Sequence, residues 1–267
     1  NNVRVIEGDF NNEMDLYNSL EGINYVFHLV SSTLPASSNE NPVYDAETNL
    51  ISSLKLFKEC LERKIRKVIF LSSGGTVYGI PESIPIKENY YSHPFCSYGI
   101  IKRTIEEYLF LFNKLHGLDY YVFRLSNPYG ERQNPFASQG AVSVFINKVI
   151  HDEKIEIWGN GEVVRDYIYI EDAVKVLVRS LEVSSSEKVF NLSTGHGYSL
   201  NEIVKVISKV SGKRIKPDYK EGRSIDVPVS VLDNSLAEKV FSWKPETSIE
   251  VGIKKTYEHL LMQDKHV

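Results

Sequence analysis

The chain has 267 residues, of which 42% are hydrophobic and 25% charged, so it can bury a sizeable core in one large domain or in one domain with a smaller lobe. Its net charge of −4 argues against a nucleic-acid-binding protein, because such proteins carry an excess of Lys and Arg. No apolar run approaches the roughly 18 residues of a membrane span. Cys60 and Cys96 lack metal-ligand or disulfide spacing, so we predict a cytoplasmic protein without a bound metal.

Apolar runs and helical patterns alternate through the first half of the chain. In order, the patterns predict a strand at 3–6, a strand at 25–30, a helix at 43–63, a strand at 67–71, a helix at 97–116 and a strand at 120–125. This alternation predicts an α/β fold with a parallel sheet wrapped by helices. In such sheets, ligands bind beyond the carboxyl ends of the strands. The residues that follow the strands at 29–33, 72–76 and 125–127 are small or polar.

The second half of the chain is less regular and is predicted to form a smaller lobe. Short strands are expected at 155–158, 167–170 and 189–192, and two helices begin at Ser199-x-x-Glu202 and Thr247-x-x-Glu250, which have the spacing of capping boxes. We assign residues 1–130 to the sheet domain and residues 131–267 mainly to the lobe, with some segments returning to the main sheet.

Tyr98 and Lys102 lie four residues apart at the start of the predicted helix at 97–116. Four residues make about one helical turn, so both side chains lie on one face. An ammonium beside a phenol favours the phenolate, which predicts a lowered pKa for Tyr98 and an acid/base role. Because such spacing also arises by chance, an exposed helix turn is the alternative interpretation, and the surrounding motifs must decide.

Nine motifs follow one another in the order of a known enzyme family. They are Gly8-Asp9-Phe10, Phe27-His28-Leu29, Thr48-Asn49, Ser72-Ser73-Gly74-Gly75-Thr76-Val77-Tyr78-Gly79, Tyr98-x-x-x-Lys102, Arg124-Leu125-Ser126-Asn127-Pro128-Tyr129-Gly130, Trp158-Gly159-Asn160-Gly161, Arg165-Asp166-Tyr167-Ile168 and Arg223-x-x-Asp226. Through them the chain resembles the extended short-chain dehydrogenase/reductases, in particular the nucleotide-sugar epimerase/dehydratase branch typified by UDP-glucose 4-epimerase. The resemblance implies a Rossmann-like doubly wound parallel sheet that binds NAD, with a smaller α/β substrate-binding lobe.

The family pattern normally begins with a strand, a Gly-x-x-Gly-x-x-Gly turn and an acidic residue, all upstream of the Gly8-Asp9 motif. This sequence contains no such turn, and its nearest glycine pairs, in 159–161 and 195–197, are predicted to be plain turns. We therefore expect a Rossmann-like domain that is truncated at its N-terminus. A natural variant that has lost dinucleotide binding is the alternative. The chain alone is expected to bind NAD poorly and to be inactive for that reason.

The resemblance also implies roles for residues around the cofactor. It implies that Asp9 and Phe10 lie beside the adenine, that Leu29, Val30 and Ser31 line the cofactor, that Asn49 and Ser72 approach it, and that Lys102 contacts the nicotinamide ribose as well as Tyr98. Family members usually carry Ser or Thr at the position of Gly74, where the hydroxyl bonds to the sugar and to the tyrosine. We predict that Thr76 supplies this hydroxyl instead, with Ser73 as the second candidate.

For the substrate, the resemblance implies contacts from both halves of the chain. The implied ligands are Thr33 near the sugar, Asn127 at the diphosphate, Trp158 near uracil, Arg165 and Arg223 at the phosphates, and Asp226 at the ribose. Guanidinium groups suit phosphates because they make paired, charge-assisted hydrogen bonds. The structural alternatives are core packing for Trp158 and an ion pair between Arg165 and Asp166.

The residues after the loop threonine favour epimerisation over the family's other reactions. Dehydratases of the family place Asp-Glu directly after this threonine, where the chain has Val77-Tyr78. Cys96 and His93 do not stand at the loop positions expected of fucose-forming epimerase/reductases. The remaining reaction is NAD-dependent 4-epimerisation, in which the Tyr98 phenolate takes the proton of the sugar 4-hydroxyl and a 4-keto intermediate forms.

The sugar and its carrier stay open at this point. A UDP-hexose or UDP-N-acetylhexosamine of polysaccharide biosynthesis is the first expectation. The loop at 31–39 resembles loops of bacterial surface-polysaccharide epimerases, including ones proposed to act on undecaprenyl-diphosphate-linked N-acetylglucosamine, which is the second. A non-catalytic nucleotide-sugar-binding homologue is the third. Family members commonly dimerise through the two helices at 43–63 and 97–116, so we predict a homodimer.

Overall fold

The computed structural model describes residues 3–91, 93–222 and 227–264. The chain forms two compact units, each assembled from several segments. Unit 1 comprises Asn1–Gly79, Tyr91–Arg124 and Ser185–Phe190, and unit 2 comprises Ile80–Tyr90, Leu125–Ser184 and Asn191–Val267. The division at residue 130 stays a prediction, because each unit contains segments from both sides of that residue.

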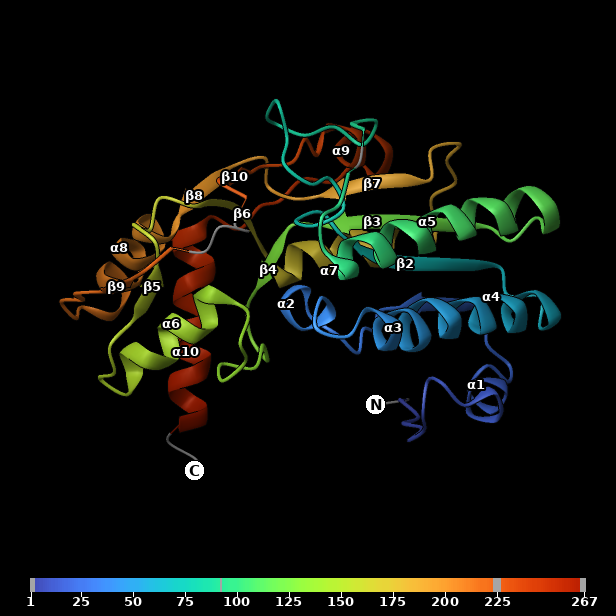
Figure 1. Ribbon diagram of the computed structural model, residues 1–267, viewed down its shortest axis with the longest axis horizontal. Helices are drawn as coiled ribbons and strands as arrows, with labels where there is room; N and C mark the ends of the chain where they lie inside the picture. Colours follow the sequence, from blue (N-terminus) through green and yellow to red (C-terminus); the bar gives the residue numbers. More distant parts are fainter. Residues whose placement is uncertain (1–2, 92, 223–226, 265–267) are drawn as a thin grey trace. The chain divides into compact units, whose positions relative to one another are not determined.

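Four strands form the main sheet, part of which is labelled in Figure 1. They are β1 (Tyr25–His28), β2 (Lys67–Ser73), β3 (Tyr120–Leu125) and β7 (Val189–Leu192), in the order β1-β2-β3-β7. β1 and β2 run parallel, with Tyr25 opposite Lys67. Every residue of β3 is buried, as expected for a strand covered on both faces. The predicted α/β fold with parallel strands is confirmed.

Most helices of unit 1 lie alongside this sheet, whereas the first of them packs outside α4 (Ser52–Glu62) (Figure 1). The helices are α1 (Glu13–Ser19), α2 (Pro35–Ser38), α3 (Pro42–Asp45), the π-helical segment η1 (Ala46–Ile51), α4 and α5 (Ser97–His116). The predicted helix at 43–63 is thus three joined segments, and the π-helical turn that interrupts it carries the buried Asn49. Such turns occur frequently at functional sites. α5 has the predicted bounds and ends at Gly117, which adopts the left-handed conformation of a C-terminal cap.

The predicted strand at 3–6 is wrong. Residues 3–9 form no strand in the structure, and Val3, Val5 and Ile6 are exposed. An apolar run becomes a strand only when a neighbouring strand supplies its hydrogen bonds. β1 is the outermost strand of the sheet on its side, and it pairs with β2 alone among the described residues.

Unit 2 contains short strands and a helical core. Its strands are β4 (Asn127–Tyr129), β6 (Val164–Tyr169), β8 (Gly197–Ser199) and β10 (Val229–Ser230) in one sheet and β5 (Glu156–Trp158) with β9 (Asp218–Lys220) in another. Its helices are α6 (Ala141–Ile150), α7 (Ile170–Arg179), α8 (Leu200–Ser211), α9 (Ser235–Phe241) and α10 (Ile249–Asp264). Ile146, Ile203 and Ile253, from α6, α8 and α10, are fully buried in one cluster.

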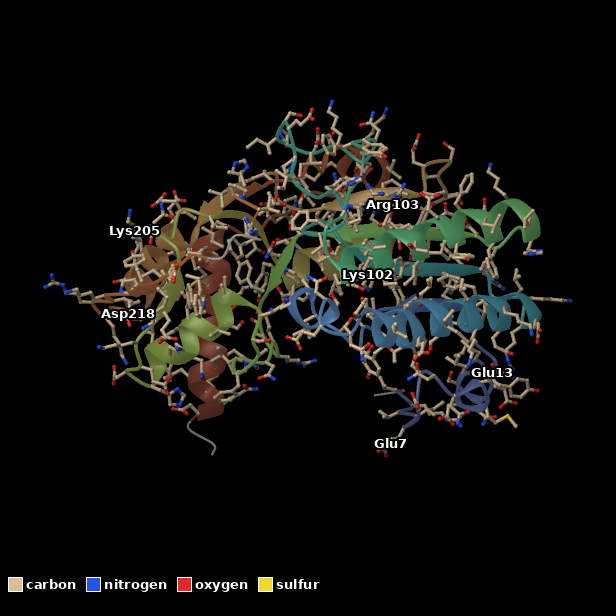
Figure 2. All side chains as sticks on the ribbon, viewed as in Figure 1. Glu7, Glu13, Lys102, Arg103, Lys205 and Asp218 are labelled. Atoms are coloured by element: carbon tan, nitrogen blue, oxygen red, sulfur yellow. The ribbon has the colours of Figure 1, made fainter. Side chains whose placement is uncertain are left out.

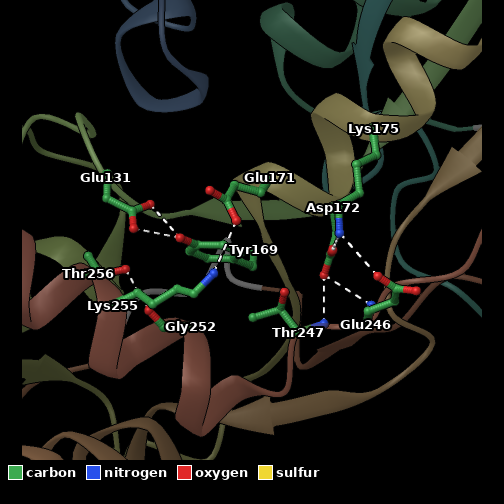
Figure 3. A network of polar contacts seen from close by, with 10 residues as sticks. All are labelled: Glu131, Tyr169, Glu171, Asp172, Lys175, Glu246, Thr247, Gly252, Lys255 and Thr256. Carbon is green, nitrogen blue, oxygen red and sulfur yellow. Dashed lines mark hydrogen bonds and ion pairs between the residues drawn. The ribbon is translucent and has the colours of Figure 1, made fainter.

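Of the two predicted capping boxes, one is confirmed. Ser199 accepts the N–H of Glu202 through its hydroxyl, and the Glu202 carboxylate accepts the N–H of Ser199 at 2.8 Å. The other is wrong, because α10 begins at Ile249 and the residue at its N-cap position is therefore Ser248 and not Thr247. The Thr247 N–H instead donates to the buried carboxylate of Asp172 at 2.8 Å (Figure 3). The local cap of α10 comes from Ser248, whose hydroxyl accepts the N–H of Val251 at 3.4 Å.

The part of the chain that the structure describes offers neither a membrane span nor a metal cluster. None of its helices is long and apolar enough to cross a membrane. The same residues contain no group of three or more His, Cys, Asp or Glu side chains that could hold a metal ion.

Candidate active site in unit 1

Tyr98 and Lys102 lie in the first two turns of α5, where the sequence places them. Lys102, labelled in Figure 2, is only 5% exposed. Its ammonium donates to the carbonyl oxygen of Leu71 in β2 at 3.1 Å. The Lys102 Nζ atom lies 5.6 Å from the centre of the Tyr98 ring. α5 therefore presents both groups at the end of β2, the edge at which ligands of parallel sheets bind.

The predicted lowering of the Tyr98 pKa is wrong for the protein by itself. Burial raises the pKa of Tyr98 to about 12, although a hydrogen bond with Ser31 acts in the opposite direction. Burial also lowers the pKa of Lys102 to about 8, against the opposing charges of Glu106 and Asp45. Desolvation disfavours the charged form of each group and is the largest cause of both shifts.

The loop that follows β2 brings a hydroxyl close to α5. A Cβ atom on Gly99 of α5 would lie 2.8 Å from the carbonyl oxygen of Thr76, so only glycine permits this close approach. The Thr76 hydroxyl is buried and has no hydrogen-bond partner among the described residues. A buried hydroxyl without a partner costs about 1–3 kcal/mol. The Thr76 hydroxyl is therefore free to bond with a hydroxyl of a ligand. Ser73, the second candidate, is half-buried at the end of β2.

The predicted cofactor residues after β1 and before α1 differ in their solvent exposure. Leu29 and Val30 expose about half of their surface (54% and 46%), directly beyond β1. Ser31 is exposed and bonds with Tyr98. Asp9 is exposed as well, and its carboxylate accepts the N–H of Asn11. Phe10 instead packs its ring 5.3 Å from that of His28. Leu29, Val30, Ser31 and Asp9 can thus meet a ligand.

Three other predicted residues have side chains that already bond within the protein. The Asn49 amide accepts the N–H of Ser32 and donates to Asp45, at 2.9 Å in both cases. The Thr33 hydroxyl donates to Asp45 at 2.6 Å. Ser72 donates its hydroxyl to Glu106 at 2.5 Å. Their roles toward a cofactor or substrate stay predictions, and the structure shows that they shape the site from within.

Three of the predicted substrate residues lie on strands of unit 2. Asn127 opens β4 and lies opposite Tyr167 of β6. Arg165 of β6 is half-buried and donates to the carbonyl oxygen of Val227 at 2.6 Å. Trp158 is 45% exposed at the end of β5, which speaks against core packing as its role. Arg223 and Asp226 lie outside the described residues, so their roles stay predictions.

The alternative for Arg165 is an ion pair with Asp166, and the carboxylate of Asp166 has other partners. The buried Asp166 carboxylate accepts the N–H groups of Thr194 and Gly195, each at 2.9 Å. Asp166 is therefore a structural residue that holds the 194–195 turn against β6.

Sequence reasoning missed two buried carboxylates, Asp45 and Glu106. Asp45 precedes Asn49 by four residues, and Glu106 follows Lys102 by four. On a helix this spacing places each carboxylate beside its motif residue. The signal was present in the sequence, but many exposed pairs share it, and only burial distinguishes these two.

The family described as NAD dependent epimerase/dehydratase family matches residues 1–193. The chain belongs to this family. The match covers both proton-transfer candidates, Tyr98 and Lys102, and the loop that carries Thr76.

Relatives of this family member include enzymes named for two kinds of activity. It is 36% identical to the UDP-glucose 4-epimerase of Thermotoga maritima, solved with UDP-glucose; the match covers 97% of this chain and 84% of that one, with a TM-score of 0.93. It is 32% identical to the UDP-N-acetylglucosamine 4-epimerase of Methanobrevibacter ruminantium M1, solved with UDP-N-acetylmuramic acid, over 97% and 83% of the two chains, with a TM-score of 0.90. It is also 34% identical to a dTDP-4-dehydro-6-deoxyglucose reductase of Escherichia coli, over 89% and 75% of the two chains.

The residues of unit 1 fit the nicotinamide and ribose of NAD in their chemistry. Leu29 and Val30 offer apolar surface to a ring, and the Lys102 ammonium offers donors to ribose hydroxyls. The unpartnered Thr76 hydroxyl provides a further polar contact nearby. The pyrophosphate-binding glycine turn of the family does not occur in this sequence, so this fit concerns the nicotinamide end alone.

Proposed function

We propose that this family member catalyses the NAD-dependent 4-epimerisation of a UDP-linked hexose or N-acetylhexosamine. The observation that carries the proposal is the pair of the half-buried Tyr98 and the buried Lys102 on α5, together with the unpartnered hydroxyl of Thr76. Two relatives that are named as UDP-sugar 4-epimerases support this choice of reaction and carrier. A cytoplasmic location and a role in polysaccharide biosynthesis stay predictions from the sequence.

In the proposed mechanism, Tyr98 takes the proton from the sugar 4-hydroxyl and later returns it. The Thr76 hydroxyl orients the sugar 4-hydroxyl by a hydrogen bond. The Lys102 ammonium stabilises the phenolate form of Tyr98. NAD, when bound, supplies a positively charged ring that accepts hydride from the sugar and gives it back. For the substrate, Asn127 and Arg165 are proposed to hold the diphosphate and Trp158 to stack on the uracil. A firmly held diphosphate leaves the sugar free to turn over between the two steps.

The proposal is tested with the natural gene product, NAD and three substrates: UDP-glucose, UDP-N-acetylglucosamine and undecaprenyl-diphosphate-linked N-acetylglucosamine. Proton NMR follows the appearance of the 4-epimer of each sugar. We expect turnover of UDP-glucose or of UDP-N-acetylglucosamine. Turnover of undecaprenyl-diphosphate-linked N-acetylglucosamine alone would overturn the proposed carrier. Binding of UDP-sugars without any turnover would show a non-catalytic homologue instead.

Replacing Thr76 by valine is expected to lower kcat about tenfold, the value of one hydrogen bond, without lowering the melting temperature. Valine keeps the shape of threonine and removes a buried hydroxyl that has no partner in the protein. Initial rates and thermal melts measure the two effects. Ser73→Ala separates the candidates, and Thr247→Val in unit 2 is the control. A larger loss of kcat in Ser73→Ala than in Thr76→Val would assign the hydroxyl that orients the sugar to Ser73 instead of Thr76.

We also propose a homodimer formed through α3, η1, α4 and α5. Ile100, Leu111 and Leu115 are exposed on α5, and their spacing of 11 and 4 residues places them on one face of the helix. An exposed apolar stripe of this kind commonly marks an interface. Light scattering is expected to give twice the chain mass for the natural protein and a single chain mass for Leu111→Glu. Met14→Glu, at an exposed site on α1, should stay dimeric. A monomeric natural protein would contradict the proposal.

A further inference from the structure

The first turn of α5 lacks a cap of its own. The residue at its N-cap, Cys96, makes no side-chain capping bond. The first N–H groups of a helix have no partner within the helix and need one elsewhere. Here the N–H of Ser97 donates to the side-chain oxygen of Asn39 at 2.9 Å, and the N–H of Tyr98 donates to the hydroxyl of Ser38 at 3.0 Å. The acceptors come from α2 and the residue after it, about 60 positions earlier in the chain.

A third bond to this turn comes from Asp45, which is fully buried at the end of α3. Its Oδ2 atom accepts the hydroxyl of Ser97 at 2.6 Å. Its Oδ1 atom accepts the hydroxyl of Thr33 at 2.6 Å and the amide of Asn49 at 2.9 Å. All three partners donate, which suits an ionised carboxylate, an acceptor at both oxygens. One side chain thus joins the loop after β1, the π-helical turn and α5.

We propose that Asp45 is a positioning residue for Tyr98, which it holds in place through Ser97 at the start of α5. The inference rests on the proposed function, in which Tyr98 is the base. A side chain in the first turn of a helix lies where helices fray most readily. Catalytic groups must stay within a fraction of an ångström of their reactive geometry, and a shift of about 1 Å can cost two orders of magnitude in rate. The external caps remove that freedom.

The same contacts explain why the segment at 31–45 is built as it is. Ser38 is fully buried although its hydroxyl is polar, because it accepts from Tyr98 and donates to the carbonyl oxygen of Pro35. We call this network of Ser38, Asn39, Asp45 and Ser97 the brace. Its polar groups have hydrogen-bond partners, which makes it rigid, whereas a buried network with unpaired polar groups would weaken the fold. Asp45 also lies close enough to favour the charged form of Lys102, so the brace and the catalytic pair share one electrostatic environment.

The first test measures the brace without any turnover. Hydrogen exchange followed by mass spectrometry reports on peptides that cover the start of α5. In the natural protein the amides of Ser97 and Tyr98 should be protected, although first-turn amides usually exchange freely. Ser38→Ala and Asp45→Asn should speed exchange there about tenfold. Ser37→Ala is the matched control, because among the described residues the Ser37 hydroxyl bonds only with Leu34. Unchanged exchange in both variants would overturn the brace.

The second test measures rate and substrate binding separately. Ser97→Ala should lower kcat about tenfold with KM unchanged, because it removes one bond that positions Tyr98 and no bond to substrate. Ser97→Thr keeps the hydroxyl and should restore the rate, which a general loss of stability would not explain. An active natural protein in which Ser97→Ala and Asp45→Asn keep full kcat would overturn the positioning role. A natural protein without epimerase activity would instead overturn the proposed function, and the exchange experiment would still decide on the brace.

Discussion

Replacing Tyr98 by phenylalanine is expected to slow the turnover of UDP-sugar about 10³-fold, within the range that a positioned acid/base contributes. The variant loses one hydroxyl and keeps the ring, so the packing at the start of α5 should persist. Proton NMR of the epimer ratio with time gives the rate. Tyr91→Phe is the matched control, because Tyr91 is 80% exposed and should not alter the rate. Equal activity in Tyr98→Phe and the natural protein would remove Tyr98 from the mechanism.

The pH profile should distinguish the two members of the pair. In the proposed mechanism the active form has Tyr98 deprotonated, with a pKa of about 12, and Lys102 protonated, with a pKa of about 8. Below pH 8, Lys102 stays charged and the phenolate fraction grows with pH, so kcat/KM should rise about tenfold per pH unit. Above pH 8, each further loss of a proton from Lys102 offsets the gain at Tyr98. The profile should therefore level off near pH 8.

This break should depend on Lys102 itself. Methionine at position 102 has a similar length and no charge, so Tyr98 alone would titrate and the rate would keep rising beyond pH 8 from a lower level. The profile of kcat/KM between pH 6 and 10 measures the difference. A break near pH 8 that persists in Lys102→Met would belong to another group.

Much of the fold followed from local patterns, because these elements are determined locally. α5 has the predicted bounds because its apolar periodicity ends at Gly117, a residue that readily adopts the left-handed conformation. The run at 3–6 has the same local character as a strand, yet no described strand pairs with it. Pairing is a tertiary property, so the sequence pattern could not decide it.

The candidate site shows the same division between local and tertiary information. The motifs identified which residues gather at the strand ends, including Thr76 and Lys102. They could not show that Ser72 bonds inward, because its partner Glu106 comes from another element. Asp45 and Asn49 share the predicted helix at 43–63, but the spacing alone did not show that this pair is buried. The motifs also gave the wrong direction for the Tyr98 pKa. Spacing reveals a neighbouring charge, whereas desolvation depends on everything packed around the phenol.

Replacing Glu106 by alanine is expected to lower the free energy of unfolding by about 4 kcal/mol, the cost of leaving a buried charge without its partner. The Glu106 carboxylate accepts from the buried Arg124 guanidinium at 2.6 Å, from Arg103 at 2.8 Å and from Ser72 at 2.5 Å. Without it, Arg124 stays charged in the core, beside the ring of Tyr78. Urea denaturation measures the change.

Glu107→Ala provides the matched control for this loss. The Glu107 side chain is 57% exposed and pairs with Arg103 at the surface, so its removal should cost less than about 1 kcal/mol. Similar losses of unfolding free energy in both variants would show that burial does not determine the effect.

Glu106→Gln tests whether the same carboxylate also affects catalysis. Glu106 raises the pKa of Lys102, so removing its charge should lower that pKa further and move the break in kcat/KM below pH 8. The buried carboxylate that stabilises the core of unit 1 would then also determine the pH range over which Lys102 can support Tyr98.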